Sequence, residues 1–179
     1  MEPDEIRELI RALDTTNITE SENAWAKLRS LGEDVLPFFV ELFPSMRKWQ
    51  GRVWIVFHSM KYAHFSEIAF QIGVFACNDK ATLVRYRACQ LLAMSQRKDA
   101  LPHLRKLLDH KDVKTSADAA AAIDAIKHKN ADYFIDRDHT GRITISTAGI
   151  ADALHQSNSP SVISQISSFI GRVFNRNRD

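Results

Sequence analysis

Residues 81–128 read ATLVRYRACQLLAMSQRKDALPHLRKLLDHKDVKTSADAAAAIDAIKH, a stretch in which apolar side chains recur every three or four positions. That period is typical of amphipathic helices, and it indicates three of them, over residues 81–94, 100–109 and 113–128. The links between them are short and polar, so we expect consecutive helices to be antiparallel neighbours. The stretch therefore predicts an all-α fold assembled from helix pairs.

The same period runs through most of residues 2–127 and predicts five further helices. They cover residues 3–13, 19–32, 35–43, 49–62 and 66–77. Thr19 with Glu22 forms a candidate capping box at the start of the second of these helices, and Gly32 is its candidate stop. The helix over residues 49–62 is apolar nearly all round, so we expect it to be the most buried.

The composition fits one helical domain, or a domain with an appended piece. Of 179 residues, 45% are apolar and 26% are charged, which excludes a fully disordered chain. Six Gly and five Pro are too few for a turn-dense β-sandwich or barrel. The formal net charge of +2 gives no general sign of a nucleic-acid binder.

Cysteine use and the N-terminus indicate a cytoplasmic protein. Cys77 and Cys89 lie within apolar helical stretches, so we expect two reduced, buried thiols. The sequence shows no secretory signal and no apolar run long enough to span a membrane. Both observations favour a cytoplasmic location.

A short motif recurs among the predicted helices. Leu36-Pro37-Phe38-Phe39 returns further along the chain as Leu101-Pro102-His103-Leu104, and each copy opens a helix that follows an Ala- and Leu-rich one. The separation is about twice the length of a helical-pair repeat, which is roughly 30 to 45 residues. Because such a pair cannot bury its own apolar face, it has to stack on the next one. The motif therefore favours a repeat architecture.

These features resemble HEAT repeats. Besides the Leu-Pro helix starts, the resemblance rests on the Ala-x-x-x-Leu spacing of Ala24 to Leu28 and Ala88 to Leu92, and on the link Asp109-His110-Lys111-Asp112-Val113. It is best over residues 81–127 and fair over 21–62. It is poor over 63–80, where the usual Asp and Arg markers are missing. The resemblance implies a HEAT-like α-solenoid, a right-handed stack of antiparallel helix pairs, over residues 1–130.

The resemblance also implies a class of function. Small bacterial HEAT-like proteins of this size are often adaptors or toxin-neutralising immunity proteins, so we expect a non-catalytic protein-binding module with a toxin domain as one candidate partner. We expect no cofactor and no metal, because the seven histidines form no metal-ligand spacing and no Gly-rich phosphate loop, nucleophile elbow or Cys–His pairing occurs.

Basic residues near aromatic ones suggest a second function. Trp49, Arg52 and Arg85 are candidate partner-binding residues, and they lie in two segments, 47–61 and 80–98, that carry further cations. If these segments line one face, they could contact phosphates, so nucleic-acid binding is the alternative function. Solvated helix faces explain the same charges without any ligand. An enzyme whose site forms only in three dimensions is a third hypothesis.

The sequence changes character after residue 130. Residues 131–147 are prone to form strands on both sides of Gly141 and predict a short β-hairpin. Residues 148–179 predict a linker and an amphipathic helix that caps the repeat stack or docks on a partner or a second copy. The tip of the hairpin carries the other candidate partner-binding residues, Asp136, Arg137, Asp138, His139 and Arg142. The same stretch resembles half of an EF-hand calcium loop, but Thr147 stands where the closing carboxylate belongs.

Overall fold

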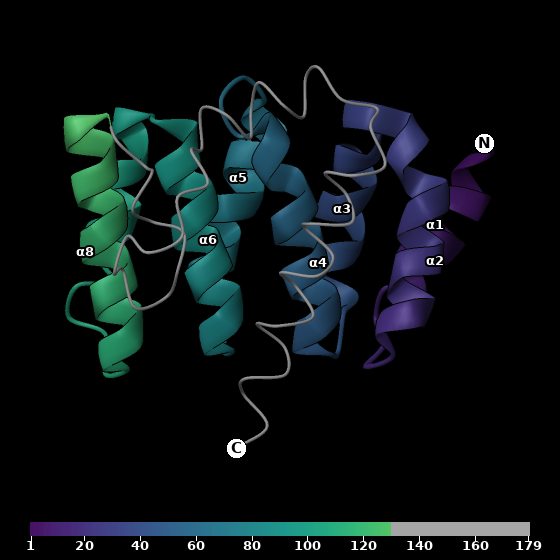
Figure 1. The fold of residues 1–179 in the computed structure, drawn as a ribbon, viewed down its shortest axis with the longest axis horizontal. Helices are drawn as coiled ribbons and strands as arrows, with labels where there is room; N and C mark the ends of the chain where they lie inside the picture. Colours follow the sequence, from purple (N-terminus) through teal and green to yellow (C-terminus); the bar gives the residue numbers. More distant parts are fainter. Residues whose placement is uncertain (130–179) are drawn as a thin grey trace. The chain divides into compact units, whose positions relative to one another are not determined.

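The computed structural model describes residues 1–129, and these residues form an all-α fold. The α-helices are α1 (Pro3–Arg11), α2 (Ile18–Leu28), α3 (Leu36–Leu42), α4 (Trp49–Ser59), α5 (Glu67–Ala76), α6 (Thr82–Ser95), α7 (Leu101–Arg105) and α8 (Val113–His128). Four 3-10 segments join them: η1 (Arg29–Val35), η2 (Phe43–Ser45), η3 (Met60–Tyr62) and η4 (Lys98–Ala100). The all-α prediction is confirmed for these residues (Figure 1).

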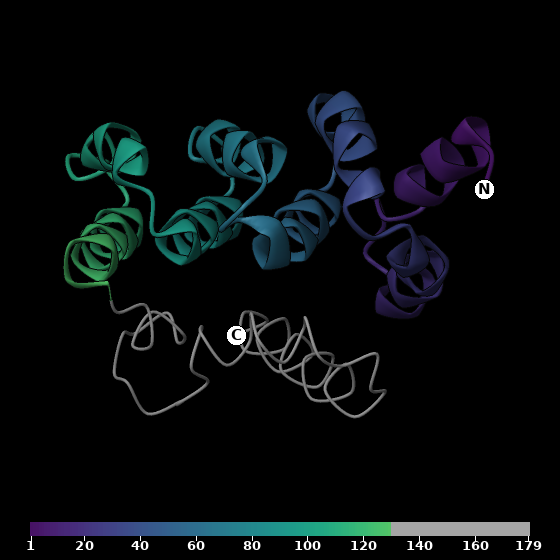
Figure 2. The same cartoon turned by 90° about the horizontal axis from the view of Figure 1, so that it is seen from above.

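The helices of residues 1–129 lie in two layers (Figure 2). One layer contains α1, α3, α5 and α7, and the other contains α2, α4, α6 and α8. Within the layers, α1 packs on α3, α3 on α5, α4 on α6 and α6 on α8. Between the layers, α1 packs on α2, α5 on α6 and α7 on α8. The predicted hairpin, residues 131–147, and the predicted terminal helix, within residues 148–179, lie outside the described residues.

Polar side chains cap the starts of three of the eight α-helices, and prolines stand at other helix starts. Asn17 caps α2, since its side-chain oxygen accepts hydrogen bonds from the backbone N–H groups of Thr19 (3.1 Å) and Glu20 (3.4 Å). The predicted Thr19 capping box is therefore wrong. Ser66 caps α5 and Asp112 caps α8 in the same way. Prolines stand in the first turns of α3 and α7, where no backbone donor is required.

The second helix ends earlier than its apolar pattern predicts. It stops at Leu28, and the chain continues as the 3-10 segment η1, which contains a kink at Gly32. Gly32 has φ +62°, in the left-handed region. A residue with a Cβ atom adopts this conformation only at a cost in free energy, whereas glycine adopts it readily. Gly32 thus redirects the chain into α3, as a stop signal should, but it does so within η1 and beyond the end of the α-helix.

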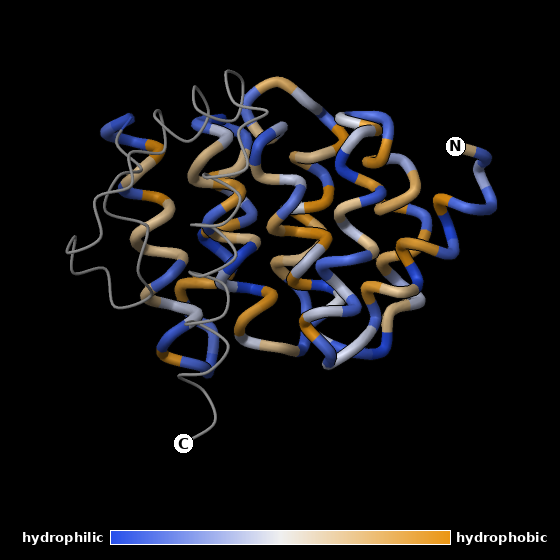
Figure 3. The backbone as a smooth tube through the Cα atoms, turned by 45° about the vertical axis from the view of Figure 1, so that its right-hand side comes forward, coloured by the Kyte–Doolittle hydropathy of each residue, from blue (hydrophilic) through white to orange (hydrophobic). Residues whose placement is uncertain are grey.

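The most buried helix is α6, and the prediction that residues 49–62 are the most buried is wrong. Eleven of the 14 residues of α6 are buried, against seven of the 11 in α4. Helix α6 packs on α4, α5 and α8, so neighbours cover it from several sides. Along the tube of Figure 3, hydrophobic and hydrophilic residues alternate within single helices. Helix α4 is the more apolar of the two and α6 is the more buried. The number of neighbouring helices therefore decides burial here more than the mean apolarity of the helix.

The two cysteines are buried free thiols, as the sequence predicts. No helix among residues 1–129 combines the length and the apolarity that crossing a membrane requires.

Candidate functional site

A buried ion pair connects α4 to the loop before α6. The Nε and Nη2 atoms of Arg52 donate to the two carboxylate oxygens of Asp79, at 2.5 Å and 3.0 Å. The Nη1 atom of Arg52 donates to the carbonyl oxygens of Met46 (3.0 Å) and Arg47 (3.2 Å). Only 6% of the Arg52 side chain and 7% of the Asp79 side chain are exposed. The guanidinium group therefore locks the turn before α4 to the turn before α6.

Arg85 repeats this arrangement one helix pair later. Its Nη1 atom donates to the carbonyl oxygens of Asp79 (2.8 Å) and Lys80 (2.9 Å), and its Nη2 atom donates to Asp112 (2.9 Å). The carbonyl groups of Asp79 and Lys80 take the places that those of Met46 and Arg47 have around Arg52, and the Asp112 carboxylate takes the place of the Asp79 carboxylate. Each of these acceptors lies as many residues after its counterpart as Arg85 lies after Arg52. We call the two linked pairs, Arg52–Asp79 and Arg85–Asp112, the Arg–Asp ladder. The ladder shows that the contacts of Arg52 recur once, around Arg85, at equivalent positions of the next helix pair.

Asp112 is the most heavily hydrogen-bonded carboxylate of the ladder. It accepts from the hydroxyls of Thr82 (2.6 Å) and Thr115 (2.8 Å), from Arg85, and from the backbone N–H of Lys114 (3.2 Å). The hydrogen bond from Thr82, together with those from Thr115, Arg85 and Lys114, holds the pKa of Asp112 well below its ordinary value. Asp112 therefore stays ionised at neutral and mildly acidic pH, and it anchors α6 to α8.

The ladder corrects the sequence analysis over residues 63–80. The sequence predicts that this stretch lacks the usual Asp marker, but Asp79 supplies it. Arg52 forms the ion pair with Asp79. A signal was present in the sequence, because the step from Asp79 to Asp112 equals the step from Arg52 to Arg85. Arg52 and Arg85, two of the residues predicted to contact a partner, are only 5% and 6% exposed. Their guanidinium groups donate hydrogen bonds to acceptors within the protein.

The other predicted site residues divide into two groups. Trp49 is half-buried at the first position of α4. The hairpin residues Asp136, Arg137, Asp138, His139 and Arg142 lie outside the described residues.

Several further cations of the proposed nucleic-acid face are also held by internal partners. Arg87 is 3% exposed, and one Nη atom donates to the Gln90 side chain at 2.6 Å. Arg97 pairs with Asp99 and with Glu67, and its guanidinium carbon lies 3.8 Å from the centre of the Phe70 ring. The segments 47–61 and 80–98 therefore do not form one continuous exposed basic surface.

Five exposed cations remain where α4, α6 and α8 begin. We call this set the basic edge; it consists of Arg47, Lys48, Lys80, Lys111 and Lys114. None of the five forms an ion pair with another residue of the described part of the chain. The Arg–Asp ladder joins the three segments that carry them, so they lie on one continuous edge of the layer.

A stack of aromatic rings connects α2 to α4. The His58 ring lies between the indoles of Trp25 and Trp54, with centroid separations of 3.6 Å and 4.9 Å and interplanar angles of 17° and 22°. The Nε2 atom of His58 is buried and has no hydrogen-bond partner. Burial, together with the nearby charge of Lys61, lowers the pKa of His58 well below its ordinary value. The stack is therefore a packing contact that requires a neutral imidazole.

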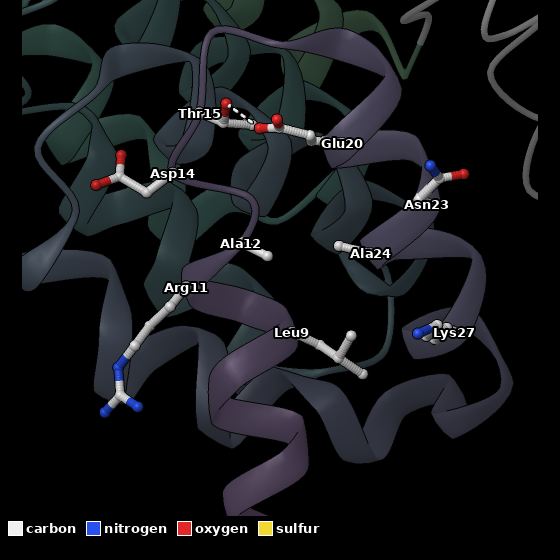
Figure 4. A pocket seen from close by; sticks show the side chains of 9 residues that line it. All are labelled: Leu9, Arg11, Ala12, Asp14, Thr15, Glu20, Asn23, Ala24 and Lys27. Atoms are coloured by element: carbon white, nitrogen blue, oxygen red, sulfur yellow. Dashed lines mark hydrogen bonds between the residues drawn. The ribbon is translucent and has the colours of Figure 1, made fainter.

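A shallow hollow of about 560 Å³ lies between α1 and α2 (Figure 4). Its walls include Leu9, Ala12 and Ala24, and a hydrogen bond of 2.7 Å between Thr15 and Glu20 closes one end. The Asp14 carboxylate accepts from the backbone N–H groups of Arg47 (2.9 Å) and Lys48 (2.7 Å), so it is already engaged. The hollow presents no convergent set of polar groups for a ligand.

Among residues 1–129, no group of three or more His, Cys, Asp or Glu side chains could hold a metal ion. Neither a protein-family model nor a curated protein matches this sequence.

Proposed function

We propose that this chain is a non-catalytic protein-binding module, built as a HEAT-like α-solenoid, a right-handed stack of antiparallel helix pairs. The observation that carries this proposal is the Arg–Asp ladder. Its two pairs, the buried Arg52–Asp79 and the partly buried Arg85–Asp112, link three consecutive helix pairs through equivalent contacts. A scaffold held in this way presents side chains of successive repeats in a constant register, which suits recognition of an extended partner surface.

A cytosolic immunity protein that neutralises a toxin is the specific form of this proposal, and it depends on the HEAT resemblance. The test starts from the full chain, immobilised and cross-linked to its partner in the source cell extract, with the partner identified by mass spectrometry. The partner is then purified, and we expect a stoichiometric complex of the two. If the partner is a toxin, coexpression of this chain restores growth of the cells that it inhibits. A chain that forms no stable complex with any purified candidate contradicts the proposal.

Nucleic-acid binding, the alternative function, has less support from the same residues. Arg52, Arg85 and Arg87 are buried and hydrogen-bonded within the protein. Binding to duplex DNA requires Lys or Arg side chains that are free to neutralise phosphates. A titration with duplex DNA over a range of salt concentrations tests this alternative directly, because phosphate binding weakens steeply as salt rises.

A further inference from the structure

We propose that the basic edge, formed by Arg47, Lys48, Lys80, Lys111 and Lys114, is a docking surface for an acidic segment of a partner protein. This inference rests on the proposed protein-binding function and names the surface and the chemistry of the partner.

The first argument is that these cations lie at helix starts, where a positive charge lowers the stability of the fold. The N-terminal end of a helix carries a partial positive charge, so acidic side chains are favoured there and basic ones are not. Helices α1, α2 and α5 follow this rule, with Asp4, Glu5, Glu20 and Glu67 in their first turns. Helices α4, α6 and α8 have no acidic residue in the first turn. Instead, exposed cations flank all three starts.

The second argument is that no nearby carboxylate among residues 1–129 forms an ion pair with a residue of the basic edge. Asp79 is neutralised by Arg52, and Asp112 by Arg85, both inside the ladder. The two carboxylate oxygens of Asp14 accept hydrogen bonds from the backbone N–H groups of Arg47 and Lys48. The exposed side chains of the basic edge therefore keep their positive charge available, and an anionic partner relieves the repulsion among them.

The third argument concerns the spacing of the edge. Arg47 and Lys80 occupy equivalent positions in successive repeats, and Lys48 and Lys114 occupy equivalent positions two repeats apart. Packed helices lie about 8–10 Å from one another, so the cations recur at roughly that interval along the edge. Duplex DNA carries one negative charge per roughly 1.7 Å of its axis, a far denser row of charge than cations at this interval match. An acidic protein segment fits this sparse row better.

The test compares two triple variants of the full chain. The edge variant carries Lys48→Gln, Lys80→Gln and Lys114→Gln. The matched control carries Lys27→Gln, Lys98→Gln and Lys127→Gln, three exposed lysines in or just after the last turns of α2, α6 and α8, away from the helix starts that carry the basic edge. Both lose three positive charges, so any difference between them reports position and not net charge. The probes are a fluorescent oligoglutamate peptide and a fluorescent DNA duplex, each titrated at physiological ionic strength.

We expect the edge variant to bind oligoglutamate about tenfold more weakly than the unmodified chain, as the loss of three exposed ion pairs predicts. The control should bind within about twofold of the unmodified chain. The edge variant should also melt at an equal or higher temperature, because it removes cations from helix N-termini. A melting temperature that does not fall separates a docking role from a structural one, since loss of a structural residue lowers the melting temperature.

Three results overturn the proposal. The first is an equal loss of oligoglutamate affinity in the edge variant and in the control. The second is that the unmodified chain binds the DNA duplex more tightly than it binds oligoglutamate. The third is that the unmodified chain does not bind oligoglutamate at all. The proposed protein-binding function has its own readout, the complex with the purified partner. If that complex forms equally well with the edge variant, the basic edge is wrong as the docking surface while the binding function stands.

Discussion

Gly51 shows how closely two backbones approach inside the fold. A Cβ atom at this position would lie 2.9 Å from the carbonyl oxygen of Leu13 and 3.0 Å from the Cα atom of Asp14. A backbone cannot move aside as a side chain can, so Gly51→Ala forces α4 away from the chain segment after α1. We expect a loss of about 1–3 kcal/mol of unfolding free energy, despite the helix propensity gained with alanine.

A second glycine supplies the control for this prediction. A Cβ atom at Gly73 would meet methyl groups of Leu91 (2.6 Å) and Leu92 (3.1 Å), which are the ends of side chains and not backbone atoms. Gly73→Ala should therefore cost less than Gly51→Ala. Urea unfolding of both variants measures the difference. Equal losses would show that the backbone contact at Gly51 has no special weight.

His58 gives the fold a dependence on pH that has a definite sign. Its folded pKa is lowered by burial and by Lys61, so the native state binds fewer protons than the unfolded chain below the ordinary histidine value. The stability it contributes is complete above about pH 6.5 and is lost as the pH falls from there toward the folded pKa. Unfolding free energy should therefore decrease between about pH 7.5 and about pH 5.5, by at most about 1.4 kcal/mol per pH unit from this group.

Two variants isolate this contribution. His58→Phe keeps a flat ring between Trp25 and Trp54 but cannot bind a proton, so its stability should fall less on acidification than that of the unmodified chain. His64 is exposed, and His64→Gln should keep the full decrease. The measurement is urea unfolding at both pH values. An unchanged decrease in His58→Phe would assign the pH dependence to other groups.

At the scale of the elements, the Arg–Asp ladder should be the most sensitive connection between helices. Asp79→Ala leaves Arg52 buried without a counter-charge, and breaking a buried pair in this way typically costs about 3–5 kcal/mol. Asp109→Ala, in the exposed link before α8, should change the stability by no more than about 0.5 kcal/mol. Urea unfolding measures both.

A double variant distinguishes charge from packing. Arg52→Met with Asp79→Leu removes both charges and retains apolar volume, so it should be more stable than Asp79→Ala alone. If the double variant loses as much as the single one, the hydrogen bonds of Arg52 to the Met46 and Arg47 carbonyl groups carry the connection instead.

The helices themselves were largely predictable from sequence, and the contacts between them were not. Helix α8 has the predicted bounds, and α5 and α6 differ from theirs by one residue at each end. Periodic apolar residues and local caps determine such segments, and both are visible in a short window. The Arg52–Asp79 pair joins residues far apart in the sequence, so it depends on the register between successive helix pairs. The basic edge depends on the same register, which explains why the predicted site included Arg52 and Arg85 and omitted Lys111 and Lys114.

At the scale of the whole molecule, the two layers imply unequal local stability. In a stack of helix pairs, each unit is stabilised mainly by its neighbours, so terminal elements open more easily than central ones. Helix α6 contacts α4, α5 and α8 and has eleven buried residues, whereas α1 packs on α2 and α3 and has two, Ile6 and Ile10. We therefore expect amide hydrogen exchange to be slower in α6 than in α1.

The ladder makes this gradient testable in a stronger form. Because Asp79 and Arg85 lie at the start of α6, Asp79→Ala should speed exchange in α4 and α6 together, while α1 exchanges as before. The measurement is hydrogen–deuterium exchange followed by mass spectrometry of peptides from each helix. Independent opening of α4 and α6 in this variant would contradict coupling through the ladder. Uniform acceleration over residues 1–129 would instead show that the helix pairs unfold as a single cooperative unit, in which position within the layers does not govern stability.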